Sequence, residues 1–305
     1  MLRARKAHRS ISEICFSRGG DAVFAKNHAF LILAHEDELM LTRLVSRLAS
    51  VGQVFVHIDA KTDISKWQFN DANCTLLRQR VPVFWGAWST VDATMLLIEE
   101  ALSEPTIDRF TLVSGTHYPI ISNEVLAQKA YSSGNIIAAR MAPNMADGSR
   151  PVSEYERRFL RTRRPNGSWA RVKNGLVNRI PWQGPLDWQS VCPATGMRAG
   201  SSYWSLQREV VEYFFTQIRL SGPLIKYFEK IVCSDEKVFA TLFGEYSDGA
   251  SNEGTTFVKW DRKQKQNPEP ITRPDIERAI RLDQYWFARK FHSYEPTILD
   301  WLDNQ

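Results

Sequence analysis

The apolar residues of the chain form short continuous runs that alternate with amphipathic stretches. Residues 28–34 and 54–60 read "HAFLILA" and "VFVHIDA", and apolar runs of this length are typical of buried strands. Between them, residues 37–50 carry leucine and valine at helical spacing, and a glycine follows at position 52. A strand, a helix and a second strand in this order predict a β-α-β unit, the building block of parallel sheets.

The same pattern continues along the chain and predicts an α/β protein with one globular domain. Further strands are expected at residues 109–115, 134–140 and 255–260, with two short strands around Pro82. Helices are expected from Ser89, with Asp92 completing a capping box, within 200–218, within 231–243 and over 272–283. In the third of these helices the predicted buried face consists of Val238, Phe239, Leu242 and Phe243.

The domain is expected to consist of three parts that follow a poorly ordered basic leader, residues 1–27. Residues 28–140 form the first half and carry the first strands, at whose carboxyl ends ligands bind in parallel sheets. Residues 141–194 are rich in Arg, Pro, Gly and Asn and read as a basic insertion. Residues 195–305 form the remaining half.

The charge is unevenly distributed. Residues 150–179 hold nine Lys and Arg and two Glu, although the net charge of the whole chain is only +5. Such a segment indicates an anionic partner, namely phosphate, nucleic acid, anionic lipid or acidic glycan. Four widely spaced cysteines argue against a zinc site or a disulfide framework and favour a reducing cytoplasm. No run of about 18 apolar residues is present.

Several common catalytic motifs are absent from the sequence. It contains no P-loop, no G-x-G-x-x-G, no H-E-x-x-H and no D-x-D motif of the kind that holds a divalent ion in many sugar-nucleotide transferases. The cluster Glu36-Asp37-Glu38 opens a predicted helix, where acidic residues are favourable without any further role. No metal site is therefore expected.

A series of short motifs does carry a resemblance. In chain order these are "LILAHED", "VHIDAK", "WGAWSTVDAT", "LVSGTHYPI", "GSSYWSL", "SDEKVFATL", "FVKWDR" and "FARKF". Together they resemble glycosyltransferase family 14, which includes the core-2/I-branching β-1,6-N-acetylglucosaminyltransferases and the peptide O-xylosyltransferases. The resemblance covers about residues 28–292 and implies a bacterial-type member with a GT-A-like fold, a Rossmann-type mixed sheet flanked by helices. It also implies that residues 28–140 are the nucleotide-sugar half and residues 195–305 the half that carries the acceptor and the chemistry.

The resemblance also implies an inverting transfer from a UDP-sugar, with GlcNAc or xylose as the expected sugar and no divalent metal. By motif position the general base is Glu236, at the start of a predicted helix, with Asp235 capping or orienting beside it. Without a metal, cationic side chains must neutralise the leaving diphosphate. Motif position assigns this to Lys259 and Lys290, with Arg262 and Arg289 as nearby substitutes.

The resemblance implies further contacts with the two substrates. His35 matches a residue that contacts the base, Asp59 lies near the uridine or ribose, and Trp85 walls the donor site. His117 stands where relatives commonly carry an acid, which implies different donor-sugar contacts here. For the acceptor, the matching residues are Glu156, Arg157, Arg158, Trp204 and Asp235.

Each assignment has a structural alternative. Asp235 and Glu236 could simply complement a helix dipole, and Asp59 could close a turn. Trp204 could pack in the core, Lys290 could be a solvated residue at a helix end, and the arginines could form a solvated face.

For the whole chain, the expected function is a cytoplasmic glycosyltransferase that acts on a glycan or lipid-linked saccharide. It would contact the inner face of the plasma membrane peripherally and serve polysaccharide or lipopolysaccharide assembly. One alternative is a non-catalytic relative that binds a UDP-sugar or glycan. The other is a nucleic-acid binder that uses residues 150–179, which the lack of a nucleic-acid-binding module disfavours.

Overall fold

The computed structural model describes residues 27–69, 71–143, 151–159, 185–247, 254–260 and 268–305. Its strands are β1 (His28–Ala34), β2 (Gln53–Ile58), β3 (Cys74–Leu76), β4 (Arg109–Ser114), β5 (Tyr118–Pro119), β6 (Arg140–Met141), β7 (Arg198–Ala199), β8 (Ser205–Gln207), β9 (Thr256–Val258) and β10 (Phe287–Arg289). Its α-helices are α1 (Glu38–Ala49), α2 (Ser89–Leu102), α3 (Asn123–Ser132), α4 (Ser153–Glu156), α6 (Arg208–Leu220), α7 (Pro223–Phe228), α8 (Asp235–Ser247), α9 (Arg273–Arg281) and α10 (Pro296–Asp303). Two 3₁₀ turns, η2 (Ile64–Lys66) and η4 (Gln189–Val191), complete the set.

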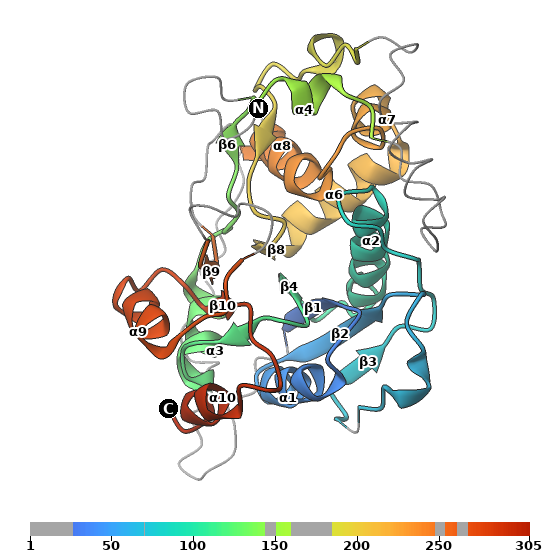
Figure 1. Cartoon of the computed structure of the whole chain (residues 1–305). Helices are drawn as coiled ribbons and strands as arrows, with labels where there is room; N and C mark the ends of the chain where they lie inside the picture. Colours follow the sequence, from blue (N-terminus) through green and yellow to red (C-terminus); the bar gives the residue numbers. More distant parts are fainter. Residues whose placement is uncertain (1–26, 70, 144–150, 160–184, 248–253, 261–267) are drawn as a thin grey trace, which may run out of the picture.

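The centre of the molecule is a five-stranded sheet in the order β3-β2-β1-β4-β8 (Figure 1). The first four strands are parallel, and β8 runs antiparallel to β4. β1 pairs with β2 on one side and β4 on the other, so that His28 lies beside Arg109 and Ala29 beside Gln53. This arrangement confirms the predicted α/β class and the mixed, GT-A-like sheet flanked by helices.

Side chains of β1 alternate between two buried layers, as the pleat of a strand requires. Ala29 and Leu31 belong to a cluster that includes residues of α2, α6 and α8. Phe30 and Ile32 belong to the opposite cluster, with residues of α1, α9 and α10. Because both faces are covered, the strand is apolar throughout, which is why it appears in the sequence as a continuous run.

A second, three-stranded sheet in the order β5-β10-β9 joins distant parts of the chain. β10 pairs antiparallel with β5, so that Ala288 lies beside Tyr118, and parallel with β9. Together with β8 in the central sheet, these pairings mean that both predicted halves of the domain, 28–140 and 195–305, contribute to both sheets. The motif "FARKF" is thereby placed beside the loop that follows β4.

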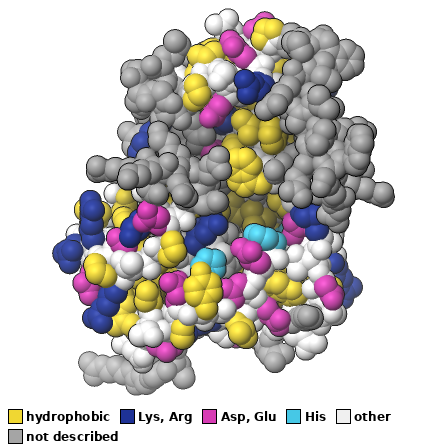
Figure 2. Space-filling view, in the orientation of Figure 1, with side chains coloured by type: hydrophobic (Ala, Val, Ile, Leu, Met, Phe, Trp, Pro, Cys, Tyr) yellow, Lys and Arg dark blue, Asp and Glu magenta, His cyan; other side chains and the backbone are white. Residues whose placement is uncertain are grey.

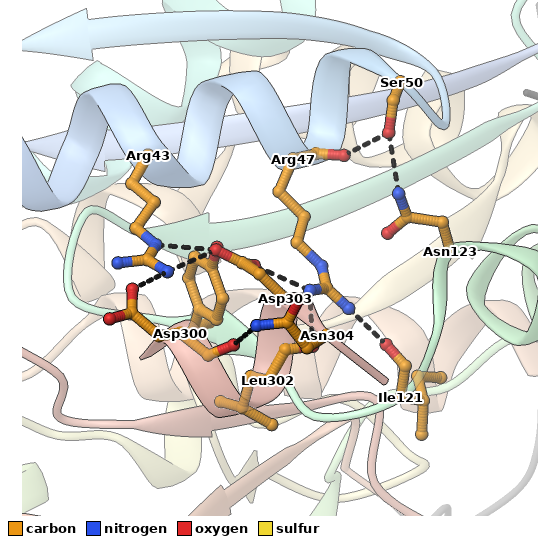
Figure 3. Close-up of polar contacts among 10 residues, drawn as sticks. Arg43, Arg47, Ser50, Ile121, Asn123, Asp300, Leu302, Asp303 and Asn304 are labelled. Carbon is orange, nitrogen blue, oxygen red and sulfur yellow. Dashed lines mark hydrogen bonds and ion pairs between the residues drawn. The ribbon is translucent and has the colours of Figure 1, made fainter. Parts of the chain in front are cut away.

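Helix α10 is fixed to α1 by a cluster of charged groups (Figure 3). Arg43 donates to both Asp300 and Asp303, and Arg47 donates to Asp303 and to the carbonyl oxygen of Leu302, each at 2.7 Å. The Tyr118 hydroxyl donates to the same Asp303 carboxylate. These bonds lower the pKa of Asp303 despite its partial burial.

Two expectations about local structure are wrong. Ser89 is the first residue of α2 and does not cap it; its Oγ instead accepts the backbone N–H of Phe84 at 2.9 Å, and no side chain caps this helix. Around Pro82 only β3 forms, because the backbone N–H groups of Val81 and Val83 bond to the side chains of His57 and Asp59 rather than to a neighbouring strand.

Other expectations are met fully or in part. Helix α9 begins with the capping box of Thr272 and Asp275 and has proline in its first turn. The expected buried face of α8 is buried: Val238, Phe239, Leu242 and Phe243. The strand expected over 134–140 is reduced to an isolated bridge at Ile136 and the two residues of β6. Residues 1–26 and most of 141–194 lie outside the described residues.

Candidate active site

The carboxyl end of β2 organises the loop that leads to Trp85. The Asp59 carboxylate accepts the backbone N–H of Lys61 at 2.9 Å and that of Val83 at 3.3 Å, and it pairs with the Lys61 ammonium. Lys61 also donates to the Val83 carbonyl oxygen. The structure therefore gives Asp59 the turn-closing role, and its contact with a uridine or ribose stays a prediction.

A second group of polar residues lies at the carboxyl end of β1. The side chain of His35 is 64% exposed, with Nε2 3.6 Å from a Glu36 carboxylate oxygen. The half-buried Lys290 is close enough to Glu36 to be influenced by its charge. Burial and the neighbouring charge of Arg289 lower the pKa of Lys290, and Glu36 opposes that effect. Lys290 has no hydrogen bond or ion pair within the part of the chain that the structure describes, so its ammonium is available to an anion.

The "FARKF" motif combines buried aromatic rings with cationic side chains, as its alternation of the two predicts. Phe287 and Phe291 are fully buried, and the Phe291 N–H donates to the Thr116 carbonyl oxygen at 3.0 Å. Arg289 extends to Tyr203, where Nη1 donates to the hydroxyl at 2.8 Å and Cζ lies 4.9 Å from the ring centroid. The buried rings thus hold two adjacent cations in the loop region beyond β4.

The carboxylates of Asp235 and Glu236 lie in the first turn of α8, and both residues are half-buried. The Ser202 hydroxyl donates to Asp235 Oδ2 at 2.7 Å. Burial and the adjacent Glu236 charge raise the pKa of Asp235 to about 6, and the Ser202 bond partly offsets this. Asp235 is therefore hydrogen-bonded to the protein, and its orienting role stays a prediction.

One short segment connects these acids to the basic wall. The Gly200 N–H donates to the Glu236 carbonyl oxygen at 2.8 Å, Ser202 bonds to Asp235, and Tyr203 bonds to Arg289. Ser202 and Tyr203 are consecutive, so a single peptide unit separates the residue bonded to Asp235 from the residue bonded to Arg289.

The same segment corrects the expectation for Trp204. Its side chain is fully buried and packs against Phe214 and Phe239 at ring-centroid distances of 6.5 and 5.9 Å. Trp204 thus takes the core-packing alternative and presents no surface to an acceptor. The sequence analysis did not identify its neighbours Ser202 and Tyr203. A signal for Tyr203 was present, because successive side chains of an extended segment point in opposite directions. If Trp204 points into the core, Tyr203 points away from it.

The loop that carries Trp85 touches the start of α8. The Gly86 carbonyl oxygen accepts the Cys233 N–H at 2.8 Å. Gly86 has φ +72, and a Cβ there would lie 3.3 Å from Val232. Glycine fits this close approach because it alone adopts that conformation without strain. Trp85 itself is 65% exposed beside this junction, consistent with a wall of the site.

Lys259 differs from Lys290 because its ammonium already has carboxylate partners. Lys259 Nζ lies 3.0 Å from Asp275 and 3.5 Å from Glu269, and these carboxylates raise its pKa. Its charge is thus already matched by two acids next to the start of α9. Arg262, the nearby substitute, lies outside the described residues.

The expected acceptor residues lie on a short segment that is packed against α7 and α8. The Tyr155 carbonyl oxygen accepts the Tyr227 hydroxyl at 2.7 Å, and Glu154 lies 3.1 Å from the ammonium of the fully buried Lys237. Beyond these anchors, Glu156 and Arg157 are exposed and Arg158 is half-buried. These three side chains follow directly on the anchored backbone, and their contact with an acceptor stays a prediction.

One face of the molecule is hollowed. Figure 2 shows a hollow midway up the face, with hydrophobic side chains inside it and basic, acidic and histidine side chains along its lower rim. In Figure 1 this position falls between α8 and the ends of β1 and β4. Within the described ranges, no group of three or more His, Cys, Asp and Glu is arranged to hold a metal ion. None of the helices there is long and apolar enough to cross a membrane.

Comparison with known proteins agrees with this geometry. Residues 28–279 match the family model described as "Branch: Core-2/I-Branching enzyme". The chain belongs to the Core-2/I-branching enzyme family. It is similar to two Arabidopsis thaliana proteins, β-glucuronosyltransferases GlcAT14B and GlcAT14A, at 30% and 27% identity over 121 residues. Each match spans 38% of this chain and only 27% of the plant protein. Both plant relatives are named as glycosyltransferases.

Proposed function

We propose that the protein transfers a sugar from a UDP-sugar to a hydroxyl of a glycan or lipid-linked saccharide, with inversion at the anomeric carbon. The carrying observation is the segment at Ser202 and Tyr203, which bonds to Asp235 on one side and to Arg289 on the other. It connects the helix start that carries a carboxylate pair with one of two adjacent cations, Arg289 and Lys290. An inverting transfer needs one group of each kind, on opposite sides of the reacting carbon.

In the proposed reaction Glu236 is the general base. Its carboxylate takes the proton of the acceptor hydroxyl as the oxygen attacks the anomeric carbon. The bond from that carbon to the diphosphate oxygen breaks, and UDP leaves with the electron pair. The support is its position by motif and in the first turn of α8, next to Asp235.

Lys290 and Arg289 neutralise the leaving diphosphate in this proposal, and no divalent metal takes part. The support is their position: Lys290 is half-buried at the carboxyl end of β1, where ligands bind to sheets of this kind. Lys259 is a weaker candidate because Asp275 and Glu269 already hold its ammonium. His35 and Trp85 are exposed and would contact the nucleotide and the donor.

The donor sugar and the acceptor follow from less direct support. The resemblance to family 14 favours GlcNAc or xylose, whereas the plant relatives are named for glucuronate transfer. The nine basic residues within 150–179 favour an anionic acceptor, such as a lipid diphosphate saccharide met at the cytoplasmic face of a membrane. Glu156, Arg157 and Arg158 begin this segment within the described residues.

The deciding experiment measures transfer or hydrolysis for a panel of UDP-sugars with Glu236→Gln and with Glu245→Gln. Glu245 lies on the same helix, near its other end, and serves as the matched control. We expect Glu236→Gln to lower kcat at least about 100-fold without weakening UDP binding, because general-base catalysis contributes about this much, and Glu245→Gln to leave kcat unchanged. Full activity of Glu236→Gln would remove Glu236 as the base. Binding without turnover in the wild type would favour a non-catalytic relative.

The metal-free part of the proposal has its own test. Activity should persist in excess EDTA and should not rise when manganese is added. Loss of turnover in EDTA with rescue by manganese would show that a divalent ion, rather than Lys290 and Arg289, carries the charge of the leaving group.

A further inference from the structure

Tyr203 reaches from the segment beside α8 to the last residue of β10. Its neighbour Ser202 donates to Asp235 Oδ2, and its own hydroxyl oxygen accepts Nη1 of Arg289 at 2.8 Å. Tyr203 is half-buried, whereas the next residue, Trp204, is fully buried. The phenol therefore leaves the core and ends beside one of the cations to which the proposed function assigns the leaving group.

Contacts on the ring fix the phenol and leave its hydroxyl hydrogen available. The His117 ring meets the Tyr203 ring edge to face at a centroid distance of 4.3 Å, and Cζ of Arg289 lies 4.9 Å from the same centroid. A phenol donates one hydrogen and accepts bonds through its oxygen. The oxygen already accepts Arg289, while no group within the described part of the chain accepts the hydrogen. Tyr203 can therefore donate to a ligand without giving up a bond.

The surroundings of this hydroxyl favour an anion. Arg289 and Lys290 are consecutive, and burial together with the charge of Arg289 lowers the pKa of Lys290. A guanidinium donates parallel hydrogen bonds from its two outer nitrogens, so that two oxygens can lie side by side on them. With the Tyr203 oxygen on Nη1, an anionic oxygen on Nη2 would lie within reach of the phenol hydrogen. An oxygen that accepts a bond from a cation also donates more strongly.

We propose that the Tyr203 hydroxyl donates a hydrogen bond to the leaving diphosphate, on an oxygen that Arg289 also binds. As the bond from the anomeric carbon to the diphosphate oxygen breaks, the electron pair stays on the diphosphate and its negative charge grows. Tyr203 keeps its proton, and its hydrogen bond becomes stronger. A donor that is fixed before the reaction stabilises such a charge without reorganisation. This inference rests on the proposed function and adds an uncharged donor to the two cations of the same site.

Tyr203→Phe tests the contact because it keeps the ring and removes only the hydroxyl. We expect kcat, with the UDP-sugar of the panel that the wild type uses fastest, to fall about tenfold to a hundredfold, as for one hydrogen bond to a charged oxygen. In isothermal titration the Kd for UDP should rise about threefold to tenfold, while that for UMP, which lacks the β-phosphate, should stay within about twofold. Tyr246→Phe, a 41% exposed residue near the other end of α8, should leave all three values unchanged.

A second background separates a direct contact from an effect through Arg289. In Arg289→Met, the further change Tyr203→Phe should still raise the Kd for UDP by at least about twofold. No further rise would show that Tyr203 only holds the guanidinium, and the inference would be wrong. It is also wrong if Tyr203→Phe keeps the wild-type kcat and the wild-type affinity for UDP, or weakens UDP and UMP equally.

The same measurements distinguish this inference from the proposed function. If the wild type binds UDP and turns over no UDP-sugar, the proposed function fails, and the selective loss of affinity for UDP in Tyr203→Phe still decides the inference. A wild type that binds neither UDP nor UMP would overturn both.

Discussion

The buried ion pair beside the candidate base allows a quantitative prediction. The Lys237 ammonium, on a side chain that is 0% exposed, lies 3.1 Å from Glu154, on a side chain that is 29% exposed. It also donates to the Val232 carbonyl oxygen at 2.7 Å and lies 5.4 Å from the Tyr155 ring centroid. Glu154→Gln keeps the shape and the acceptor oxygen and removes only the charge, so the ammonium stays buried without a counter-ion.

The magnitude follows from the degree of burial. Removing one partner of a fully buried pair costs about 3–5 kcal/mol. Because Glu154 is partly exposed and a glutamine oxygen still accepts a hydrogen bond, we expect about 2 kcal/mol for Glu154→Gln. The matched control is Glu99→Gln, whose partner Arg219 lies at 2.6 Å with both side chains about half exposed. That change should cost less than about 0.5 kcal/mol.

Urea unfolding followed by tryptophan fluorescence measures both changes. In a Lys237→Met background the ammonium is absent, and Glu154→Gln should then change the free energy of unfolding by less than about 0.5 kcal/mol. The reasoning is refuted if Glu154→Gln and Glu99→Gln lower the free energy of unfolding equally. It is also refuted if Glu154→Gln costs as much in the Lys237→Met background as in the wild type.

Three other predictions follow from single features. Burial lowers the pKa of His28 to about 3 and that of His57 to about 4. Below about pH 6.5 the unfolded chain protonates these two histidines and the folded chain does not, so Tm should fall between pH 7 and 5. His57→Gln should make this dependence of Tm on pH less steep. Gly86→Ala places a side chain at φ +72 against Val232 and should cost about 1–2 kcal/mol in urea unfolding; an unchanged midpoint would contradict the close approach. Lys259→Met should leave the Kd for UDP within about twofold, since a partnered ammonium contributes little, and a tenfold loss would return Lys259 to the site.

The sequence predicts the fold best where one physical effect dominates. The segment from β1 to β2 and the helix α9 are correct because burial on two faces and a capping box each leave a periodic signature. The errors at Ser89 and around Pro82 have another cause, namely hydrogen bonds between the backbone and side chains. Around Pro82 the backbone bonds to His57 and Asp59, which lie more than 20 positions earlier in the sequence. The Ser89 hydroxyl could cap a helix or accept another backbone N–H, and it accepts that of Phe84. Secondary-structure propensity depends on the local sequence and does not predict such bonds.

The candidate site shows the same division. Motif position predicts Glu236 and Lys290 as site residues, and the structure places them at a helix start and at the carboxyl end of a strand. Their roles stay predictions. Motif position could not show that Lys259 is already paired or that Trp204 is in the core, because both outcomes depend on neighbours distant in sequence. The link through Tyr203 to Arg289, 86 residues away, is likewise a product of the tertiary fold.

The attachment of α10 to α1 has a consequence for synthesis of the protein. Arg43 and Arg47 belong to the first helix of the described chain, and their partners Asp300 and Asp303 lie 256 to 260 positions later. During translation these arginines lack their carboxylates until residues 300–303 have left the ribosome. The first β-α-β unit can collapse early, but its outer face is completed last. Contacts of such long sequence separation slow folding, and an incomplete chain exposes this face to chaperones.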